Sequence, residues 1–161
     1  MLLTAEIRRL VRQEGLGFVA TVRPDGSPAL SPKGTLSVVD ERHLAFVNLA
    51  SPHTVANLRR DPRLEVNVVD PILRKGYRFV GTGQVLTDGP DYSRLMDWFA
   101  DQRGTDYRTR AQGIVLITVT VVEPLISPAY DDGTPETEIT RQWLDYYTEL
   151  HDRRQHAARH S

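Results

Sequence analysis

The chain has 161 residues, which fits one domain with enough apolar sequence to build a core without disulfides or metals. Its residues are 40% hydrophobic and 25% charged, and its net charge of −1 argues against a chain that is disordered throughout or that coats nucleic acid. It has no cysteine and no leader pattern or apolar run near the roughly 18 residues of a membrane span, so we expect a cytoplasmic protein without disulfides, thiol nucleophiles or Cys-ligated metals.

The first sixty residues predict a group of strands with one short helix on each side. Thr4 is a candidate N-cap for the first helix, and Pro52 suits the first position of the second. Pro24-Asp25-Gly26-Ser27 is a strong turn signal, and Pro32 places the strand that contains it at a sheet edge or a bulge. In chain order we expect a helix over 4–14, extended segments over 18–23, 29–33, 35–39 and 43–48, and a helix over 51–60.

The rest of the chain predicts longer strands and two further helices. Gly81 and Gly83 lie inside the longest expected strand and indicate a bulge or a barrel bend. We expect strands over 64–68, 77–86 and 114–122, a loop over 71–76, a polar connection over 102–112 and irregular chain over 123–133, with helices that begin at Asp88 and Thr134.

The last expected helix has an aromatic side, and the chain after it is polar. Trp143, Tyr146 and Tyr147 give this helix more aromatic surface than a solvated tail needs, so we expect it to pack on the barrel or across a subunit interface. Residues 151–161 are polar and predict a frayed end.

Six or seven strands in hairpin-like succession favour an antiparallel meander, and a sheet of that length tends to close because closure removes its edges. The sequence therefore predicts a mainly β (α+β) fold. We expect a small barrel with peripheral short helices and a C-terminal helix, organised as one domain over 1–161 that ends in the helix and tail of 134–161.

Recognisable catalytic motifs are missing from the sequence. It has no Ser–His–Asp signature, Walker loop, dinucleotide fingerprint or zinc-binding His-Glu-x-x-His, so no catalytic residue and no metal ligand is assigned. Three of the five histidines lie in the tail, where a surface position is more common than metal binding. His43 lies at a turn-to-strand junction and is interpreted as structural.

The most informative stretch is 46–62, where an expected strand leads into the N-terminus of a short helix. Free backbone N–H groups and the helix dipole favour a phosphate there, and Ser51, His53 and Thr54 add side-chain donors. The alternative is that Ser51 is only an N-cap.

Two other stretches contain the only two lysines and several arginines. In Ser31-Pro32-Lys33-Gly34-Thr35, a broken edge strand exposes backbone groups and Lys33, unless this is simply an irregular hairpin with a solvated lysine. In 74–78, Arg74, Lys75 and Arg78 could meet an anion or could belong to a solvated loop.

Together these stretches resemble the pyridoxamine 5′-phosphate oxidase-related family of FMN-binding split-barrel proteins, over roughly residues 5–122. The resemblance lies in an ordered series: Gly17-Phe18-Val19-Ala20-Thr21, Pro24-Asp25-Gly26, Ser31-Pro32-Lys33-Gly34, Phe46-Val47-Asn48, Asn57-Leu58-Arg59-Arg60-Asp61-Pro62 and Tyr77-Arg78-Phe79-Val80-Gly81-Thr82-Gly83. It implies a split barrel, a homodimer with two FMN sites at the subunit interface, and a flavin-dependent oxidoreductase acting on a small molecule.

The resemblance also implies positions around the cofactor. The stretch from Ser31 to Thr35 would run beside the isoalloxazine ring, Val47 and Asn48 would lie under the cofactor, and the turn from Ser51 to Thr54 would hold its phosphate. A cation near the flavin ring raises its reduction potential, so Lys33 is expected to tune that potential. The cofactor-binding residues implied are Ser31, Pro32, Lys33, Gly34, Thr35, Val47, Asn48, Ser51, His53, Thr54, Asn57, Lys75 and Arg78.

The sequence departs from the oxidase proper in two places. At the phosphate turn the oxidase carries an Arg-Lys pair where this chain has His53 and Thr54, so charge would have to come from Lys33, Lys75 or Arg78. The Arg-Leu-x-Pro tail that helps to hold pyridoxal phosphate is replaced by the stretch from Gln155 to Ser161, so the vitamin B6 oxidase activity is not carried over.

Two alternatives stay open beside an FMN enzyme. The same fold can bind the deazaflavin F420, although the longer anionic tail of that cofactor calls for more Lys and Arg along the groove than this chain offers. A non-catalytic flavin or haem binder is the other, in which His53 or His43 would ligate haem. The sequence names neither the substrate nor the electron donor.

Overall fold

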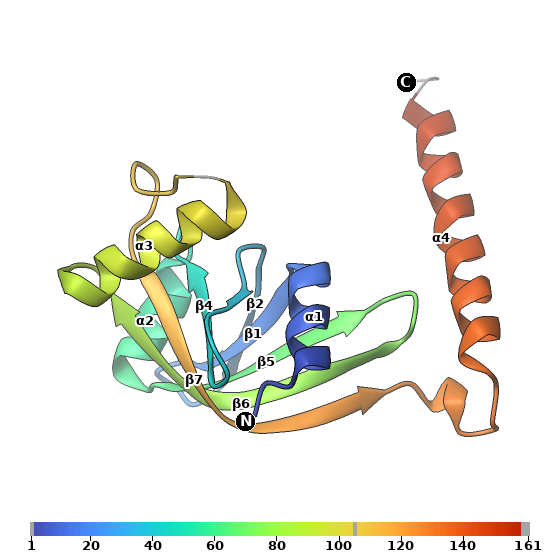
Figure 1. Ribbon diagram of the computed structural model, residues 1–161, viewed down its shortest axis with the longest axis horizontal. Coiled ribbons are helices and arrows are strands. Elements are labelled where there is room, and N and C mark those ends of the chain that lie inside the picture. Colours follow the sequence, from blue (N-terminus) through green and yellow to red (C-terminus); the bar gives the residue numbers. More distant parts are fainter. Residues whose placement is uncertain (1, 105, 159–161) are drawn as a thin grey trace.

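The computed structural model describes residues 2–104 and 106–158 and shows seven strands and four α-helices around one curled sheet (Figure 1). The helices are α1 (Ala5–Glu14), α2 (Pro52–Arg60), α3 (Gly89–Arg103) and α4 (Glu136–Ala158), with a short 3-10 helix η1 (Pro128–Tyr130) before α4. The strands are β1 (Gly17–Val22), β2 (Pro28–Lys33), β3 (Ser37–Val38), β4 (His43–Val47), β5 (Arg63–Asp70), β6 (Lys75–Leu86) and β7 (Ile114–Ile126).

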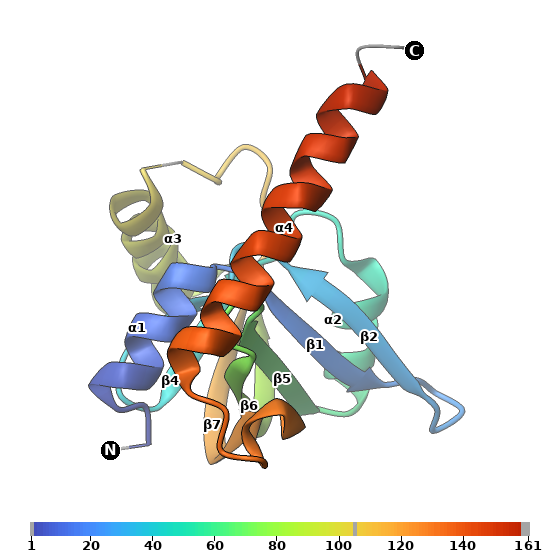
Figure 2. The ribbon, with the colours of Figure 1, turned by 90° about the vertical axis from the view of Figure 1, so that its right-hand side faces the viewer.

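The sheet is antiparallel throughout and has the order β2-β1-β5-β6-β7-β4-β3. It confirms the mainly β split-barrel prediction and the place of β2 at an edge. The sheet does not close on itself, since β2 and β3 end it and are not paired with each other. The sheet instead curls around its core as an open half-barrel, which is visible when Figures 1 and 2 are compared.

The bulge expected near the glycines of β6 is present and bends the two longest strands together. The register of β6 against β7 shifts between Val80 and Gly81. A Cβ on Gly81 would lie 2.2 Å from the carbonyl oxygen of Thr118, so only glycine lets the two backbones approach this closely.

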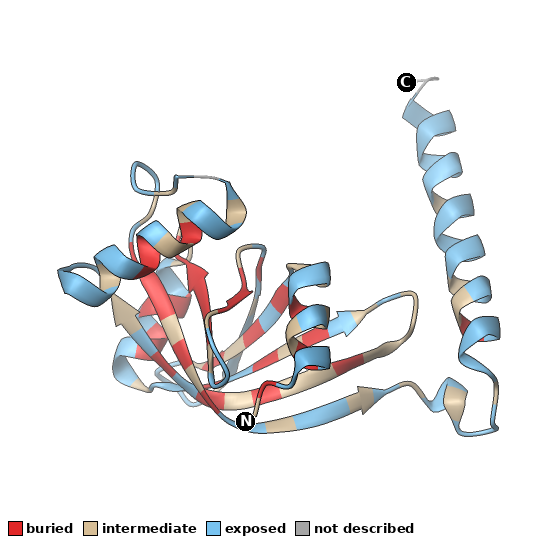
Figure 3. Cartoon of the chain, viewed as in Figure 1, coloured by how far each residue is buried: buried red, intermediate tan, exposed pale blue. Residues whose placement is uncertain are grey.

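Two clusters of buried apolar residues form the core, and Figure 3 shows that the buried segments are concentrated on the strands of the curled sheet. The first packs α1 onto the strands through Ile7 and Val11, with Phe46 and Phe79 at its centre. The second packs Phe99 of α3 against β4 and β7. His43 is structural as predicted, since its Nδ1 lies 2.8 Å from a carboxylate oxygen of Asp40 and helps to close the turn before β4.

The opposite face of the sheet carries a row of cross-strand neighbours, which we call the outer row. It runs over Leu30, Ala20, Glu65, Val80 and Val121, one residue from each of five adjacent strands. Leu30 is 69% exposed and Val121 is 45% exposed, and Phe18, two residues from Ala20 on β1 and on the same face, is 45% exposed. This face therefore exposes apolar side chains of β2, β1 and β7 in the single chain, beside a charged group formed by Glu65, Arg78 and Glu123.

The end of the chain is more regular than expected. Strand β7 continues to Ile126, four residues beyond the predicted end. Helix α4 continues to Ala158, so the frayed tail predicted from residue 151 is wrong over its described part, while 159–161 lie outside the described residues. A search of the described helices finds none that is long and apolar enough to cross a membrane.

Candidate anion-binding pocket

A tight loop joins β4 to α2 and sets the start of that helix. Asn48 is buried, and its side-chain oxygen accepts a 2.9 Å hydrogen bond from the backbone N–H of Ser51. The backbone N–H of Asn48 donates to the carbonyl of Gly113, which fixes the loop to the start of β7. Pro52 then occupies the first turn of α2, as the sequence predicts.

Lys33 lies at this loop with its ammonium group surrounded by hydroxyls, an arrangement that we call the Lys33 cluster. The Nζ atom donates to Ser51 Oγ at 2.7 Å, to Ser31 Oγ at 2.8 Å and to Thr54 Oγ1 at 3.2 Å. It also lies 5.4 Å from the ring centre of Phe46. These contacts bring together residues from β2, the β4–α2 loop and the first turn of α2.

The cluster corrects two interpretations of the sequence. Lys33 is only 5% exposed, so the solvated-lysine alternative is wrong. Ser51 stands at the N-cap position of α2, but its hydroxyl makes no capping bond and accepts from Lys33 instead. The free N–H groups of the first turn of α2 therefore remain available at the same place as the lysine charge.

The electrostatics of the cluster favour an anion. Burial lowers the pKa of Lys33, because a charged amine loses hydration there. None of the ion pairs found among the described residues involves Lys33, and its partners are neutral hydroxyls. A buried cation without a counter-charge is costly, and an anion bound beside it removes much of that cost.

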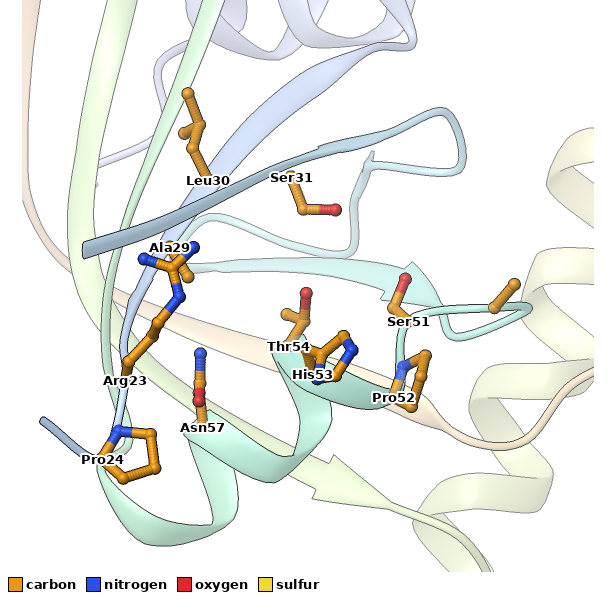
Figure 4. A pocket seen from close by; sticks show the side chains of 11 residues that line it. Arg23, Pro24, Ala29, Leu30, Ser31, Ser51, Pro52, His53, Thr54 and Asn57 are labelled. Atoms are coloured by element: carbon orange, nitrogen blue, oxygen red, sulfur yellow. The ribbon is translucent and has the colours of Figure 1, made fainter. Parts of the chain in front are cut away.

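A pocket of about 490 Å³ opens directly over the cluster (Figure 4). It runs between β2 and α2, from the hydroxyls of Ser31, Ser51 and Thr54 to Arg23 and Pro24 at the β1–β2 turn. Ala29, Leu30, Ala50, Pro52, His53 and Asn57 complete its lining. The size suits a ligand larger than a lone phosphate, with its anionic end at the Lys33 cluster.

Arg23 puts a second cation at the other end of the pocket. Its guanidinium donates to the carbonyl of Pro28 and, at 3.4 Å, to Ser27 Oγ, so it is held along the hairpin. Arg60 supports the same corner by donating to the carbonyls of Val22 and Arg23 at 2.9 and 2.6 Å. The sequence predicts the turn of this hairpin, but no pattern in it indicates that Arg23, Pro24, Ala29, Leu30 and Ala50 line a pocket.

The predicted site residues divide into two groups. Five line the pocket: Ser31, Ser51, His53, Thr54 and Asn57, with Lys33 directly behind three of them. The amide of Asn57 donates to Thr21 Oγ1 at 3.0 Å and is buried, which ties α2 to β1.

The other predicted residues do not line this pocket. Thr35 instead bridges the strands, since its hydroxyl accepts from the N–H of Val47 and donates to its carbonyl. Val47 and Asn48 are buried behind the pocket, whereas Pro32 and Gly34 are exposed at the edge of the sheet.

The cationic stretch that follows β5 serves a different part of the molecule. Lys75 pairs with Glu136 at 2.5 Å, Arg74 lies 4.1 Å from the ring centre of Trp143, and Arg78 lies near Glu65 and Glu123 at 3.5 and 3.6 Å. In the single chain, Lys75 and Arg78 therefore do not meet the pocket over the Lys33 cluster. Their expected approach to a cofactor is not found within one protomer.

Comparisons with known proteins identify the family of this chain. The model of the pyridoxamine 5′-phosphate oxidase family matches residues 3–125, which include every strand but the last residue of β7 and the whole pocket. The chain belongs to the pyridoxamine 5′-phosphate oxidase family. A search of the curated proteins gives no match. The family match ends before α4, so this helix is outside the shared part.

Solved structures with the same fold include three that cover most of this chain. The H111A variant of HupZ from Group A Streptococcus is 28% identical, with a TM-score of 0.67 over 78% of this chain and 100% of its own. Rv2991 from Mycobacterium tuberculosis is 22% identical, with a TM-score of 0.64 over 81% and 88% of the two chains. An FMN-binding protein from Syntrophomonas wolfei is 16% identical, with a TM-score of 0.62 over 76% and 85%.

The described residues offer no alternative metal centre. No group of three or more His, Asp or Glu among them lies close enough together to hold a metal ion. The pocket over the Lys33 cluster is therefore the candidate site for which the geometry gives a defined chemistry.

Proposed function

We propose that this protein binds FMN with its phosphate at the Lys33 cluster and works as a flavin-dependent oxidoreductase on a small molecule. The single observation that carries the proposal is the buried ammonium group of Lys33 below three hydroxyls and the start of α2, in a pocket large enough for more than a phosphate. Membership of the pyridoxamine 5′-phosphate oxidase family supports it, as do structural neighbours described as FMN-binding, FAD-binding and an F420 reductase.

The residues present fit a phosphate monoester. Lys33 supplies the charge that the Arg-Lys pair supplies in the oxidase, while Ser31, Ser51 and Thr54 offer hydroxyl donors. The positive end of α2 adds a contribution of typically about 0.3–1 kcal/mol, and each hydrogen bond to a charged group adds about 1.5–3 kcal/mol. These terms all favour binding of the phosphate at this end of the pocket.

Beyond the phosphate, the chain would position the rest of the cofactor. A bound flavin supplies the redox chemistry, and the protein contributes binding, orientation and electrostatics. The pocket extends along Ala29 and Leu30 of β2 toward Arg23, which is the direction left for the ring once the phosphate lies at the cluster. No side chain in this lining is assigned as a catalytic acid or base.

The proposal assigns a different role to Lys33 from the one expected from the resemblance. A lysine at the phosphate end is separated from the isoalloxazine ring by the ribityl chain, so it anchors the cofactor and has little influence on the reduction potential. Arg23 is the cation at the ring end of the pocket.

We also propose that the working form is a homodimer. The sheet face that carries the outer row exposes Leu30, Phe18 and Val121 by 45% or more, beside the charged side chains of Glu65, Arg78 and Glu123. Such a face is typical of a protein–protein interface. A two-fold pair would cover it on both copies at once and give the pocket beside β2 a second wall.

Cofactor binding by matched variants tests the proposal. The purified protein is titrated with FMN, with riboflavin, which lacks the phosphate, and with F420, while absorption and flavin fluorescence are recorded. We expect FMN to bind and riboflavin to bind at least about tenfold more weakly, since the loss of one charge-assisted hydrogen bond costs about 1.5–3 kcal/mol.

The two lysines of the chain provide the control. Lys33→Met should reduce the affinity for FMN to that for riboflavin, whereas Lys75→Met, which removes an ion pair with Glu136 instead, should leave it unchanged. Equal affinity of the wild type for FMN and riboflavin would refute the phosphate site. Binding of F420 in preference to FMN would show a deazaflavin protein instead.

A further inference from the structure

Helix α4 stands apart from the rest of the molecule. Among the described residues, the side chains that join α4 to the body of the protein lie in its first two turns, where Ile139 is buried, Glu136 pairs with Lys75 and the ring of Trp143 lies against Arg74. Beyond Trp143 the helix extends away from the sheet, which Figures 1 and 2 show from two directions. A helix of 23 residues is thus attached to the body at one end only.

The exposed part of α4 has an apolar face rather than a polar one. Apolar residues recur every three or four positions and form one stripe, which we call the α4 stripe: Ile139, Trp143, Tyr146, Tyr147 and Leu150. The rings of Trp143, Tyr146 and Tyr147 contact one another, with ring centres 5.3–6.4 Å apart. Tyr146 is still 47% exposed and Tyr147 is 36% exposed, so a large part of both residues faces solvent in the single chain.

A helix of this kind needs packing to be stable. Isolated helices are marginal in water, and most helical stability in proteins comes from burial of an apolar face. Three aromatic rings in contact with water also make a poor solvent face. The α4 stripe therefore calls for a surface that the single chain does not provide.

The charges on α4 indicate what that surface carries. Over residues 136–152 the helix has five carboxylates and one arginine, and Glu138, Asp145 and Glu149 lie along one side of the stripe. Helix α1 of the same chain carries three arginines against two glutamates, Glu6 and Glu14, and Arg9 and Arg12 are exposed beside the half-buried Arg8. A second copy of this chain thus offers arginines to the acidic side of α4.

The route of the chain points to the same occupant. Helix α4 follows the end of β7 through η1, and β7 contributes Val121, which is 45% exposed, to the outer row, while Ile126, which is 59% exposed, points to the other face beside α1. An arm that begins at the edge of an uncovered face reaches whatever packs on that face. In a two-fold symmetric dimer, α4 of each copy would contact the other copy, so that the same contact between α4 and its partner would form twice.

We infer that the α4 stripe packs on a second copy of this chain, as an arm that holds the homodimer together from outside the family fold. The inference rests on the proposed homodimer but not on the flavin. The arm lies beyond the segment that the family model matches, so it would be a feature added to the shared fold rather than part of it.

Sedimentation of the full chain over a series of concentrations tests the inference. One variant, Trp143→Ala with Tyr147→Ala, removes the centre of the stripe. The control, Arg141→Ala with Asp152→Ala, lies on the opposite side of the helix and leaves the net charge unchanged. We expect the first to raise the dimer dissociation constant by at least about tenfold, because buried Trp and Tyr dominate interfaces, and the second to change it by less than about twofold.

Tryptophan emission gives a measurement that does not depend on a deleted ring. In a Trp98→Phe background, Trp143 is the only tryptophan left. Its emission should shift to the red when the dimer is diluted to monomers, because its ring then becomes more exposed to water. The helical circular dichroism signal should fall in the same concentration range.

The possible outcomes distinguish failure of the arm from failure of the proposed homodimer. A chain that is monomeric at every concentration would refute both the homodimer and the arm. A dimer that is equally tight with the stripe removed, with no change in Trp143 emission, would refute the arm alone and leave the sheet face as the interface.

Discussion

Replacement of Lys33 by methionine should make the ligand-free protein more stable and its binding of FMN weaker. Methionine has a similar length and no charge, so it fills the same space beside Phe46 without an ammonium group. Burial lowers the pKa of Lys33, which means that the folded state disfavours the charged form that exists at neutral pH. Removal of this charge therefore relieves a cost that the wild type carries.

The magnitude follows from what the substitution removes and what it leaves. Replacing buried charged groups by apolar residues of similar volume is often neutral or stabilising by about 1–4 kcal/mol. Against this, Thr54 lines the pocket but is only 5% exposed and loses a hydrogen-bond partner, which costs about 1 kcal/mol, whereas Ser31 and Ser51 are half-buried and can bond to water. We expect a net gain of about 1 kcal/mol, or a rise in Tm of about 2–4 °C for a domain of this size.

Thermal unfolding with and without FMN is the assay. At neutral pH the variant should unfold at a higher temperature than the wild type without ligand, and the same concentration of FMN should raise the Tm of the wild type more than that of the variant. The advantage of the variant should shrink as the pH rises toward 10.5, because the wild type loses the proton in its folded state and the cost disappears. A ligand-free Lys33→Met protein that melts well below the wild type, at every pH, would refute the reasoning.

Three further predictions follow from the same geometry. Thr54→Glu places a carboxylate within reach of Lys33, so FMN binding should be lost in a titration while the circular dichroism spectrum stays native. The affinity for phosphate-bearing ligands should fall as the pH rises through the lowered pKa of Lys33, and this fall should be absent in Lys33→Met; a pH-independent wild-type affinity would contradict it. Gly81→Ala should lower the Tm through an overpacking cost of about 1–3 kcal/mol, since its Cβ would meet the carbonyl of Thr118, while Gly34→Ala, which meets nothing within 4 Å, should leave the Tm within a degree or two.

Most of the fold could be predicted from local patterns. Strand and helix periodicity located nearly every element, the Asp25-Gly26 turn joined β1 to β2, and the glycines of β6 indicated the bulge at Gly81. What local patterns could not give was the pairing of β4 with β7, because these strands are separated by more than 65 residues of sequence. The open edges follow from this long-range pairing and not from any strand alone.

The candidate site shows the same division. The helix start at Ser51 and Thr54 was visible in the sequence because residue types at a helix N-terminus have a physical meaning. The position of the Lys33 amine could not be predicted from the sequence, because a flexible side chain can point to either face of an edge strand. Only the folded structure shows that this amine reaches α2. The geometry of the hairpin places Arg23 in the lining of the pocket. A single arginine beside a turn does not indicate such a position in the sequence.

The prolines of β2 limit how copies of this protein can associate. Pro28 and Pro32 stand four residues apart in an edge strand, so their backbone nitrogens, which carry no hydrogen, point to the same outer side. A foreign strand that tried to extend the sheet there would find only the N–H of Leu30 between two missing donors. Growth of the sheet into fibrils or runaway polymers is thus blocked at this edge, and contacts between copies are directed to side chains instead of backbones.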